Sequence, residues 1–369
     1  MRNHPSTECR TVADSRRHSI VINCRIFQMP TGFLILHVGP LAYADLHFLA
    51  VADWGGLPVW PYWTPGQRKV ARAMGRVAER FGSSFALTLG DHFYFSGVKS
   101  ADDPRWRRTF ERVFTHPMLQ GAGFWRAVAG NHDHDGNISA QLAYSARNGS
   151  RWHYPALQHR WREKLPTDEG TIVDIVLIDT VLLCGPPGRE VSRIDKLAAR
   201  SWAWVEAALE DSADADYLIV AGHYPVHSPS SHGPTRCLRR RLEPLLHKFQ
   251  VSSYFSGHDH AMFHIGGAGA QYHGVGAGFM LSSSRKHVHT IPPAQLHFFR
   301  RARSPLRGVA QGGFAGVSVS AAALSIRHYD ESGRVLHQAN VLPRPRRPAP
   351  ASVATSGAPH SSGSNVCER

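Results

Sequence analysis

Five short motifs of this sequence place aspartate, asparagine or histidine directly after an apolar run and beside a glycine. Such oxygen and imidazole donors, with no cysteine among them, favour iron, manganese or zinc over copper(I) or an iron–sulfur cluster. The glycines let the backbone turn tightly and approach a bound ion or phosphate. The motifs are Val51-Ala52-Asp53-Trp54-Gly55, Gly90-Asp91-His92-Phe93-Tyr94, Gly130-Asn131-His132-Asp133, Gly222-His223-Tyr224-Pro225 and Gly257-His258-Asp259-His260.

The number of donors points to two metal ions. One ion does not need so many ligands once substrate and water also bind, whereas two ions that share a bridging carboxylate do. Ions roughly 3.5–4 Å apart can clamp a phosphate and activate hydroxide for in-line attack on phosphorus. The sequence therefore predicts a two-metal phosphoesterase. The candidate ligands within these motifs are Asp53, Asp91, Asn131, His223, His258 and His260.

Each motif also has an ordinary structural explanation. A single Asp-x-Gly or Asn-His-Asp is usually a turn, and a His-x-His at a strand end can belong to a polar rim. The ordered occurrence of all the motifs, each after a predicted strand, favours the metal site over a set of unrelated turns.

The elements that must position these motifs alternate between apolar runs and helical patterns. In an open α/β sheet, ligands collect at the carboxyl ends of the strands, so we expect the donors to meet at one rim. Thr64-Pro65 is a helix start signal and Gly82 a stop signal. The predicted strands are 47–53, 85–91, 125–132, 172–179, 217–223 and 251–258, and the predicted helices are 65–81, 104–114, 195–211 and 237–249.

The last third of the chain changes character. Residues 314–320, 324–330 and 335–342 alternate in polarity, with a turn at 331–333, which indicates an antiparallel closing sheet. We expect an α/β fold of the α+β sandwich kind, with two stacked mixed β-sheets flanked by helices. It should form one domain over residues 45–342, after an N-terminal extension (1–44) and before a disordered basic and Ser/Gly/Pro-rich tail (343–369).

Composition and charge limit the partners. The 369 residues are 42% hydrophobic and 10% aromatic, enough for a packed core. A net charge of +14 with 24 further histidines would attract acidic partners such as phosphoproteins, although a solvated basic face explains it equally well. The chain contains no RNP, zinc-finger or helix-turn-helix signature, and its sequence contains no apolar run of the length a membrane span needs. We therefore expect neither nucleic-acid binding nor a membrane span.

Several features suggest a secretory route. An apolar stretch at 26–38 follows Arg25 and ends in the A-x-A pattern of Ala42-Tyr43-Ala44, typical of a signal peptide. A structured N-terminal extension is the alternative, and the sequence leaves open whether Met1 or Met29 starts the native chain. Asn137 and Asn148 begin glycosylation sequons. Of the five cysteines, Cys184 and Cys237 fall inside the globular region and are predicted to form a disulfide.

The order of the motifs resembles the calcineurin-like metallophosphoesterases. Within them, the tyrosine in Gly90-Asp91-His92-Phe93-Tyr94 is similar to the purple acid phosphatase branch. Gly130 to His134, Gly136 to Gln141, Ala221 to Val226 and His232 to Thr235 are similar to its tartrate-resistant group almost letter for letter. The resemblance runs from about residue 45 to 347 and implies a four-layer metallophosphoesterase fold.

The resemblance also implies a division of the ligands between two iron ions. Fe3+ would be held by Asp53, Asp91, Tyr94 and His260. Fe2+, with Zn2+ or Mn2+ as alternatives, would be held by Asp91, Asn131, His223 and His258. A phenolate is a hard anionic donor that stabilises the trivalent state. Because a trivalent ion lowers the pKa of bound water further than zinc does, an acidic optimum is expected.

The same resemblance assigns His132 and His232 to the substrate phosphate, as charge-neutralising groups or general acids. Cys184 and Cys237 fall where the disulfide of the family lies. His92 departs from the usual Asn after the bridging Asp, and could crowd the site, compete for metal or change the pH profile. Ala52 replaces the usual Gly. The segment 185–196 is shorter than the mammalian loop whose cleavage raises activity, so control by proteolysis is in doubt.

The function expected from the sequence is that of a secreted or lysosomal, monomeric acid phosphatase. It would hydrolyse phosphate monoesters, including acidic phosphoproteins and small aryl or alkyl phosphates. Two alternatives stay open. The first is a phosphodiesterase or nucleotide hydrolase of the same fold, and the second is a non-catalytic protein that binds acidic matrix through its basic face.

Overall fold

In the computed structural model, the described residues are 45–166, 170–187, 196–267 and 269–345, together with the backbone of a separate antiparallel pair, β1 (Cys9–Ala13) and β2 (Ile20–Cys24). The signal-like segment and the tail beyond residue 345 lie outside them, so those two predictions stay untested. No helix in the described ranges is long and apolar enough to cross a membrane.

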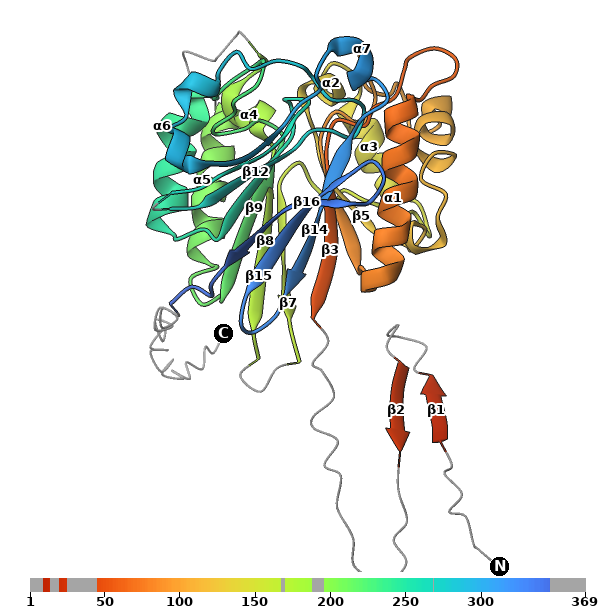
Figure 1. The fold of residues 1–369 in the computed structure, drawn as a ribbon, viewed down its shortest axis with the longest axis vertical. Coiled ribbons are helices and arrows are strands. Elements are labelled where there is room, and N and C mark those ends of the chain that lie inside the picture. Colours follow the sequence, from red (N-terminus) through yellow and green to blue (C-terminus); the bar gives the residue numbers. More distant parts are fainter. Residues whose placement is uncertain are drawn as a thin grey trace, which may run out of the picture.

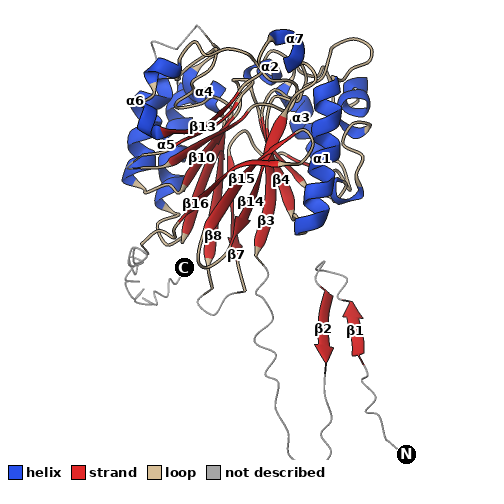
Figure 2. Ribbon diagram, in the orientation of Figure 1, coloured by secondary structure: helices blue, strands red, loops and turns tan. Residues whose placement is uncertain are grey.

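Two seven-stranded sheets form the centre of the fold (Figures 1 and 2). The strand order is β16-β15-β14-β3-β4-β5-β6 in the first sheet and β13-β11-β12-β10-β9-β8-β7 in the second. The first sheet consists of β3 (Leu46–Val51), β4 (Phe85–Leu89), β5 (Trp125–Val128), β6 (Trp152–His153), β14 (Gly313–Val319), β15 (Leu324–Asp330) and β16 (Val335–Val341). The second consists of β7 (His159–Lys164), β8 (Ile172–Ile178), β9 (Tyr217–Gly222), β10 (Ser253–Ser256), β11 (Met262–Ile265), β12 (Gln271–Val275) and β13 (Leu296–Arg300).

Helices cover the outer face of each sheet, which gives four layers. Figure 1 shows α1 (Pro65–Phe81) on the side of the first sheet, and α5 (Lys196–Glu210) and α6 (Arg236–Lys248) on the side of the second. Between the sheets, apolar side chains such as Phe48, Leu87 and Ile219 are fully buried. The predicted fold class is confirmed. The shorter helices are α2 (Asn131–His134), α3 (Ile138–Ser145), α4 (Thr180–Cys184) and α7 (Pro305–Gly308), with 3-10 turns at Pro117–Leu119, Val288–Thr290 and Pro293–Gln295.

The strands that precede the motifs are parallel to one another. β3, β4 and β5 pair in parallel in the first sheet, and β8, β9 and β10 do so in the second. Their carboxyl ends therefore lie at one edge of each sheet, below the loops and short helices at the top of Figure 1. The C-terminal strands also form the predicted antiparallel arrangement. They do not form a sheet of their own, because β14 pairs with β3 and so extends the first sheet.

The caps of α1 agree with the sequence. The Thr64 hydroxyl accepts a hydrogen bond from the Gln67 N–H (3.1 Å), and Gly82 ends the helix in the left-handed conformation, with φ 63°. The helix predicted over 104–114 is present, but most of it is a π-helix rather than an α-helix. Residues Trp106–Glu111 form a single π-helical segment, in which the Arg112 N–H bonds the Arg107 carbonyl five residues back.

Five histidines meet where the two sheets pack against each other. His264 of β11 and His273 of β12 come from the second sheet, and His328 of β15 and His337 of β16 come from the first. His264 Nδ1 lies 2.9 Å from His337 Nε2, and His273 Nδ1 lies 3.1 Å from His328 Nε2. The ring of His297, next to β11, lies 4.9 Å from that of His264. The two hydrogen bonds join one sheet to the other.

Candidate metal centre

All the predicted ligands lie at the carboxyl edge of the sheets, on loops that follow β3, β4, β5, β9 and β10. Both sheets contribute, so the candidate centre bridges them. The donors form two groups that share one region of the rim. The first contains Asp53, Tyr94 and His260, and the second contains Asp91, Asn131, His223 and His258.

The first group is compact. The Tyr94 hydroxyl donates to Asp53 Oδ1 at 3.0 Å and lies 2.8 Å from His260 Nε2. His260 Nε2 in turn lies 3.5 Å from Asp53 Oδ1. Three donor atoms therefore face one point between the loops after β3, β4 and β10.

The second group is more deeply buried. His223 Nε2 lies 3.1 Å from Asn131 Oδ1 and 3.4 Å from Asp91 Oδ1. One ligand atom from each of Asp91, His223 and His258 lies within 4.8 Å of the other two, and all three residues are buried. This geometry fits an ion held by imidazole, carboxylate and amide donors.

His223 is oriented for such a role. Its Nδ1 lies 2.8 Å from the Leu89 carbonyl oxygen, and because a carbonyl can only accept, Nδ1 carries the proton. Nε2 is the atom that faces Asn131 and Asp91, where a metal ion would take the place of its proton. A hydrogen bond from the second ring nitrogen to a carbonyl is the usual way in which a metal-binding histidine is held.

The electrostatics of the site favour a cation. Asp53 and Asp91 are buried, and within the described ranges their ion-pair partners are histidines. Burial would raise the pKa of Asp91, but the charge and hydrogen bond of His223 outweigh it and lower that pKa. Burial, and then the nearby Asp53 and Asp91, raise the pKa of Tyr94 well above its ordinary value. A Tyr94 phenolate therefore requires additional positive charge beside it.

Two glycines permit the close approach of the loops. A Cβ on Gly130 would lie 2.3 Å from Asp91 Oδ1, and a Cβ on Gly257 would lie 2.3 Å from Asp53 Oδ2. Non-bonded atoms cannot lie this close, so replacing either glycine would displace the neighbouring carboxylate. In addition, Asp53, Asp91 and His258 have left-handed backbones, with φ of 56°, 54° and 67°. Non-glycine residues adopt this conformation at functional sites when the surroundings hold them there.

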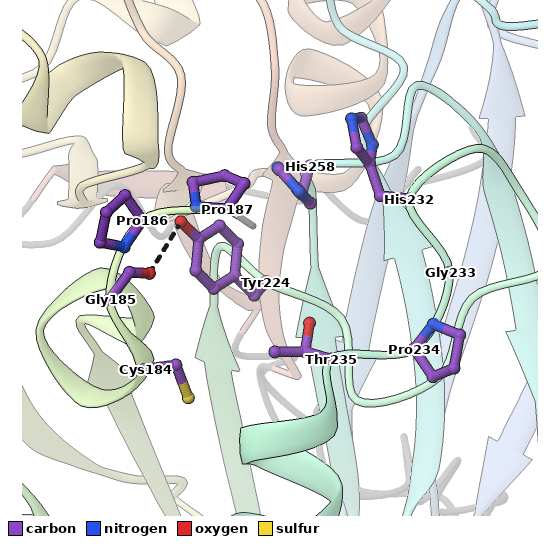
Figure 3. Close-up of a pocket in the computed structure, with 10 residues that line it drawn as sticks. All are labelled: Cys184, Gly185, Pro186, Pro187, Tyr224, His232, Gly233, Pro234, Thr235 and His258. Carbon is purple, nitrogen blue, oxygen red and sulfur yellow. Dashed lines mark hydrogen bonds between the residues drawn. The ribbon is translucent and has the colours of Figure 1, made fainter. Parts of the chain in front are cut away.

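The two predicted substrate-facing histidines lie at the edge of the cluster. His132 Nδ1 donates to the Phe95 carbonyl at 2.7 Å, and the His132 ring lies 5.0 Å from that of Tyr94. The His232 ring lies 4.1 Å from that of His258, and Figure 3 shows both side chains at the pocket. The hydrogen bond to Asp259, opposed by burial, raises the pKa of His232, which favours its protonated form.

Two buried aspartates were given no role in the sequence analysis. Asp259 accepts several hydrogen bonds from residues 228–233. Asp133 accepts from the N–H groups of Gly130 (2.9 Å) and His92 (3.1 Å) and from Gln141 Nε2 (2.9 Å). The sequence did contain a signal for them, because each is an acidic residue directly next to a candidate ligand or substrate-facing histidine.

His92 does not join the metal cluster. Its ring is fully buried against Trp152, with ring centres 4.7 Å apart. Its Nε2 accepts a hydrogen bond from the Gly90 N–H (3.2 Å), and its Nδ1 lies 3.2 Å from Asp133 Oδ2. Both ring nitrogens are thus occupied by protein groups, which argues against the expectations that His92 crowds the site or competes for metal.

A pocket of about 180 Å³ lies beside His232 and His258 (Figure 3), and Tyr224 and Thr235 help to line it. The Cys184–Cys237 disulfide is present at its base and joins the end of α4 to the start of α6, as predicted. The predicted glycosylation residues, Asn137 and Asn148, are both exposed, but their modification stays a prediction.

Comparisons with known proteins agree with this geometry. The family model for calcineurin-like phosphoesterases matches residues 41–262. Tartrate-resistant acid phosphatase type 5 of Oryctolagus cuniculus is 38% identical to the chain, over 85% of the chain and 98% of that protein. The Sus scrofa protein of the same name is 40% identical, over 82% and 88%. Purple acid phosphatase 4 of Arabidopsis thaliana is 29% identical, over 83% and 90%.

Solved structures show the same fold at lower identity. The structure described as GAP50, the anchor in the inner membrane complex of Plasmodium, matches with a TM-score of 0.70 at 22% identity, over 82% of this chain and 90% of that one. A yellow lupin purple acid phosphatase matches with a TM-score of 0.56 at 13% identity, over 81% and 54%. These two similarities concern the fold alone. From the family match and the identities above, the chain belongs to the calcineurin-like phosphoesterases, and within them to the purple acid phosphatases.

Proposed function

We propose that this protein is a metal-dependent acid phosphatase that hydrolyses phosphate monoesters. The observation that carries the proposal is the convergence of seven oxygen and imidazole donors from five loops at one rim. Membership in the purple acid phosphatases supports the reaction type. The non-catalytic alternative fits less well, because a binding protein has no use for two buried carboxylates and three histidines turned toward each other.

The donor set fits two ions that prefer different kinds of ligand. Asp53, Asp91, Tyr94 and His260 would hold Fe3+, since they include the phenol and two carboxylates, the hard anionic donors. Asp91, Asn131, His223 and His258 would hold Fe2+, with Zn2+ or Mn2+ as alternatives. When bound, such a pair would neutralise the phosphate and supply hydroxide near neutral or acidic pH.

The side chains of the protein have three tasks around these ions. His223 is held by the Leu89 carbonyl so that its Nε2 faces inward. His132 is held in the same way by the Phe95 carbonyl, which leaves its Nε2 available to the substrate. His232, whose pKa is raised, is suited to give a proton to the leaving alkoxide or to neutralise the phosphate.

The signal-like segment, the sequons and the net charge support a location and a class of substrate for this activity. The signal-like segment and the exposed sequons support a secreted or lysosomal protein. A net charge of +14 supports acidic phosphoproteins among the substrates, because such a surface attracts them electrostatically. We propose that the protein acts as a monomer.

The test is metal analysis of the purified protein together with the rates of p-nitrophenyl phosphate and bis(p-nitrophenyl) phosphate hydrolysis at acid pH. We expect two metal ions per chain and faster hydrolysis of the monoester. Asp91→Asn should lose most of the metal and the activity. Asp102→Asn, at an exposed carboxylate paired with Arg147, should keep both. A faster diester reaction would identify a phosphodiesterase, and a metal-free protein would end the enzyme hypothesis.

A further inference from the structure

Asp259 lies between two candidate metal ligands, but its side chain turns away from them. The carboxylate is fully buried, and every hydrogen bond it accepts in the described part of the chain comes from residues 228–233. Oδ2 accepts from the Ser228 hydroxyl and from the Gly233 N–H (3.2 Å). Oδ1 accepts from the Ser231 hydroxyl (2.8 Å) and from the backbone N–H of His232 (2.9 Å).

The fifth donor is the imidazole of His232. Its Nδ1 lies 2.9 Å from Asp259 Oδ1. An ionised carboxylate has no proton to give, so Nδ1 must carry the hydrogen and Nε2 must be the outward nitrogen. The His232 side chain is 49% exposed, which leaves Nε2 open to a ligand in the pocket.

The backbone of Asp259 is fixed as firmly as its side chain. The Asp259 N–H bonds the Gly257 carbonyl (2.8 Å), and the Ala261 N–H bonds the Asp259 carbonyl (2.6 Å). Gly276 packs so close to this turn that a Cβ there would lie 2.3 Å from the backbone carbonyl oxygen of Asp259. A rigid turn therefore presents His258 and His260 on one side and the Asp259 carboxylate on the other.

We propose that Asp259 is a positioning residue for the proposed hydrolysis. It fixes the tautomer of His232 and the distance of this histidine from the metal ligands, because one residue is tied both to the ligand turn and to the loop that carries His232. The inference depends on the proposed function, in which His232 protonates or neutralises the leaving group. It assigns Asp259 no contact with the substrate.

This role predicts an effect on activity that misfolding of the variant would not produce. Protonation matters most for poor leaving groups, so Asp259→Asn should slow an alkyl phosphate more than p-nitrophenyl phosphate. We expect kcat for the alkyl ester to fall about 10- to 100-fold, the loss typical of a group that orients a functional side chain from behind. The aryl ester, whose leaving group needs little protonation, should lose less. Metal content and the visible spectrum should stay those of the wild type.

A double-variant cycle gives the second readout. If Asp259 acts through His232, Asp259→Asn should change kcat little once His232→Ala is present. Asp174→Asn is the matched control, because Asp174 is also a buried carboxylate, but it pairs with Arg162 on β7, outside the ligand loops. This control should lower stability while leaving the ratio of alkyl to aryl rates unchanged.

The outcomes separate this inference from the proposed function. Equal losses for both esters, additive effects in the His232→Ala background, or loss of metal from Asp259→Asn would overturn the positioning role while wild-type phosphatase activity stands. A wild-type protein without metal or activity would instead remove the proposed function itself.

Discussion

Asp53 Oδ2 accepts a hydrogen bond of 2.8 Å from the backbone N–H of His258, a residue 205 positions further along the chain. Asp53 follows β3 of the first sheet, and His258 follows β10 of the second. This bond ties together ligand loops that belong to different sheets. The spacing of the two ligand groups is therefore set by the packing of the sheets as much as by the ligand loops themselves.

Gly130→Ala tests this dependence on close backbone approach. The new methyl group would lie 2.3 Å from Asp91 Oδ1 and 2.6 Å from the Asp91 nitrogen, so the carboxylate must move. We expect metal affinity to fall about 10- to 100-fold, with a far-UV spectrum like that of the wild type. Gly121→Ala is the control, since its methyl group would meet only Phe124 Cβ, at 3.9 Å. Unchanged metal binding in Gly130→Ala would contradict the arrangement described.

Tyr94→Phe tests the iron assignment. A phenolate bound to Fe3+ gives a charge-transfer band in the visible range, and the Tyr94 hydroxyl lies within hydrogen-bond distance of both Asp53 and His260. We expect the iron-loaded wild type to be coloured and the variant to lose the band. Tyr217→Phe, which removes a hydroxyl buried away from the rim, should keep it. A colourless wild type that contains only zinc would rule out the iron assignment but not the hydrolytic activity.

The inter-sheet histidines predict a loss of stability in acid. Burial, and then neighbouring histidines, lower the pKa of His328 to about 3. Burial first, opposed by the Gln271 hydrogen bond and aided by His337 and His297, lowers that of His264 to about 4. In the unfolded chain these histidines take up protons below about pH 6.5. In the folded chain they stay neutral until the pH approaches their lowered pKa values of about 3 and 4. The free energy of unfolding should thus fall from about pH 6.5 downward, by about 1.4 kcal/mol per pH unit for each histidine.

The measurement is urea unfolding between pH 7.5 and 4.5. His328→Gln keeps a neutral polar side chain and removes one titrating group, so its stability should decline less steeply with acid than that of the wild type. His289→Gln, at an exposed position, should reproduce the wild-type slope. Parallel curves for wild type and His328→Gln would show that this cluster does not control acid stability.

The Cys184–Cys237 disulfide closes a sequence separation of 53 residues and anchors α6 beside the pocket. Replacing both cysteines by serine should lower the free energy of unfolding by about 2–4 kcal/mol, as for disulfides that close loops of this length. Chemical denaturation gives the value. Dithiothreitol should destabilise the wild type by a similar amount and leave the double variant unaffected, which distinguishes the bond from a packing effect of the two serines.

Much of the site was predictable because its positions follow from local rules. Fully buried apolar runs such as Phe85–Leu89 predict parallel strands, and strand ends predict where polar residues gather. The start and end of α1 could be predicted from Thr64 and Gly82, since caps are local features. The predicted disulfide followed from only two cysteines lying inside the globular region.

The rest depends on contacts that no local pattern contains. Asp259 looks like a spacer between two histidines, and its role appears only when the loop at 228–233 folds over it. The histidine cluster exists because β11 and β12 pack on β15 and β16, which belong to another sheet. The left-handed backbones of Asp53 and Asp91 are likewise imposed by the loops around them. Tertiary packing decides each of these features.

The pairing of β14 with β3 has a consequence for how the protein is made. Leu46–Val51 leaves the ribosome before Gly313–Val319, and one edge of this strand has no neighbour until that later strand has been translated. Between these two events the nascent chain therefore carries an open, apolar strand edge, the kind of edge that pairs with other chains. Growing chains should need shielding by chaperones over this interval, and a message truncated before the codons for Gly313–Val319 should yield insoluble product.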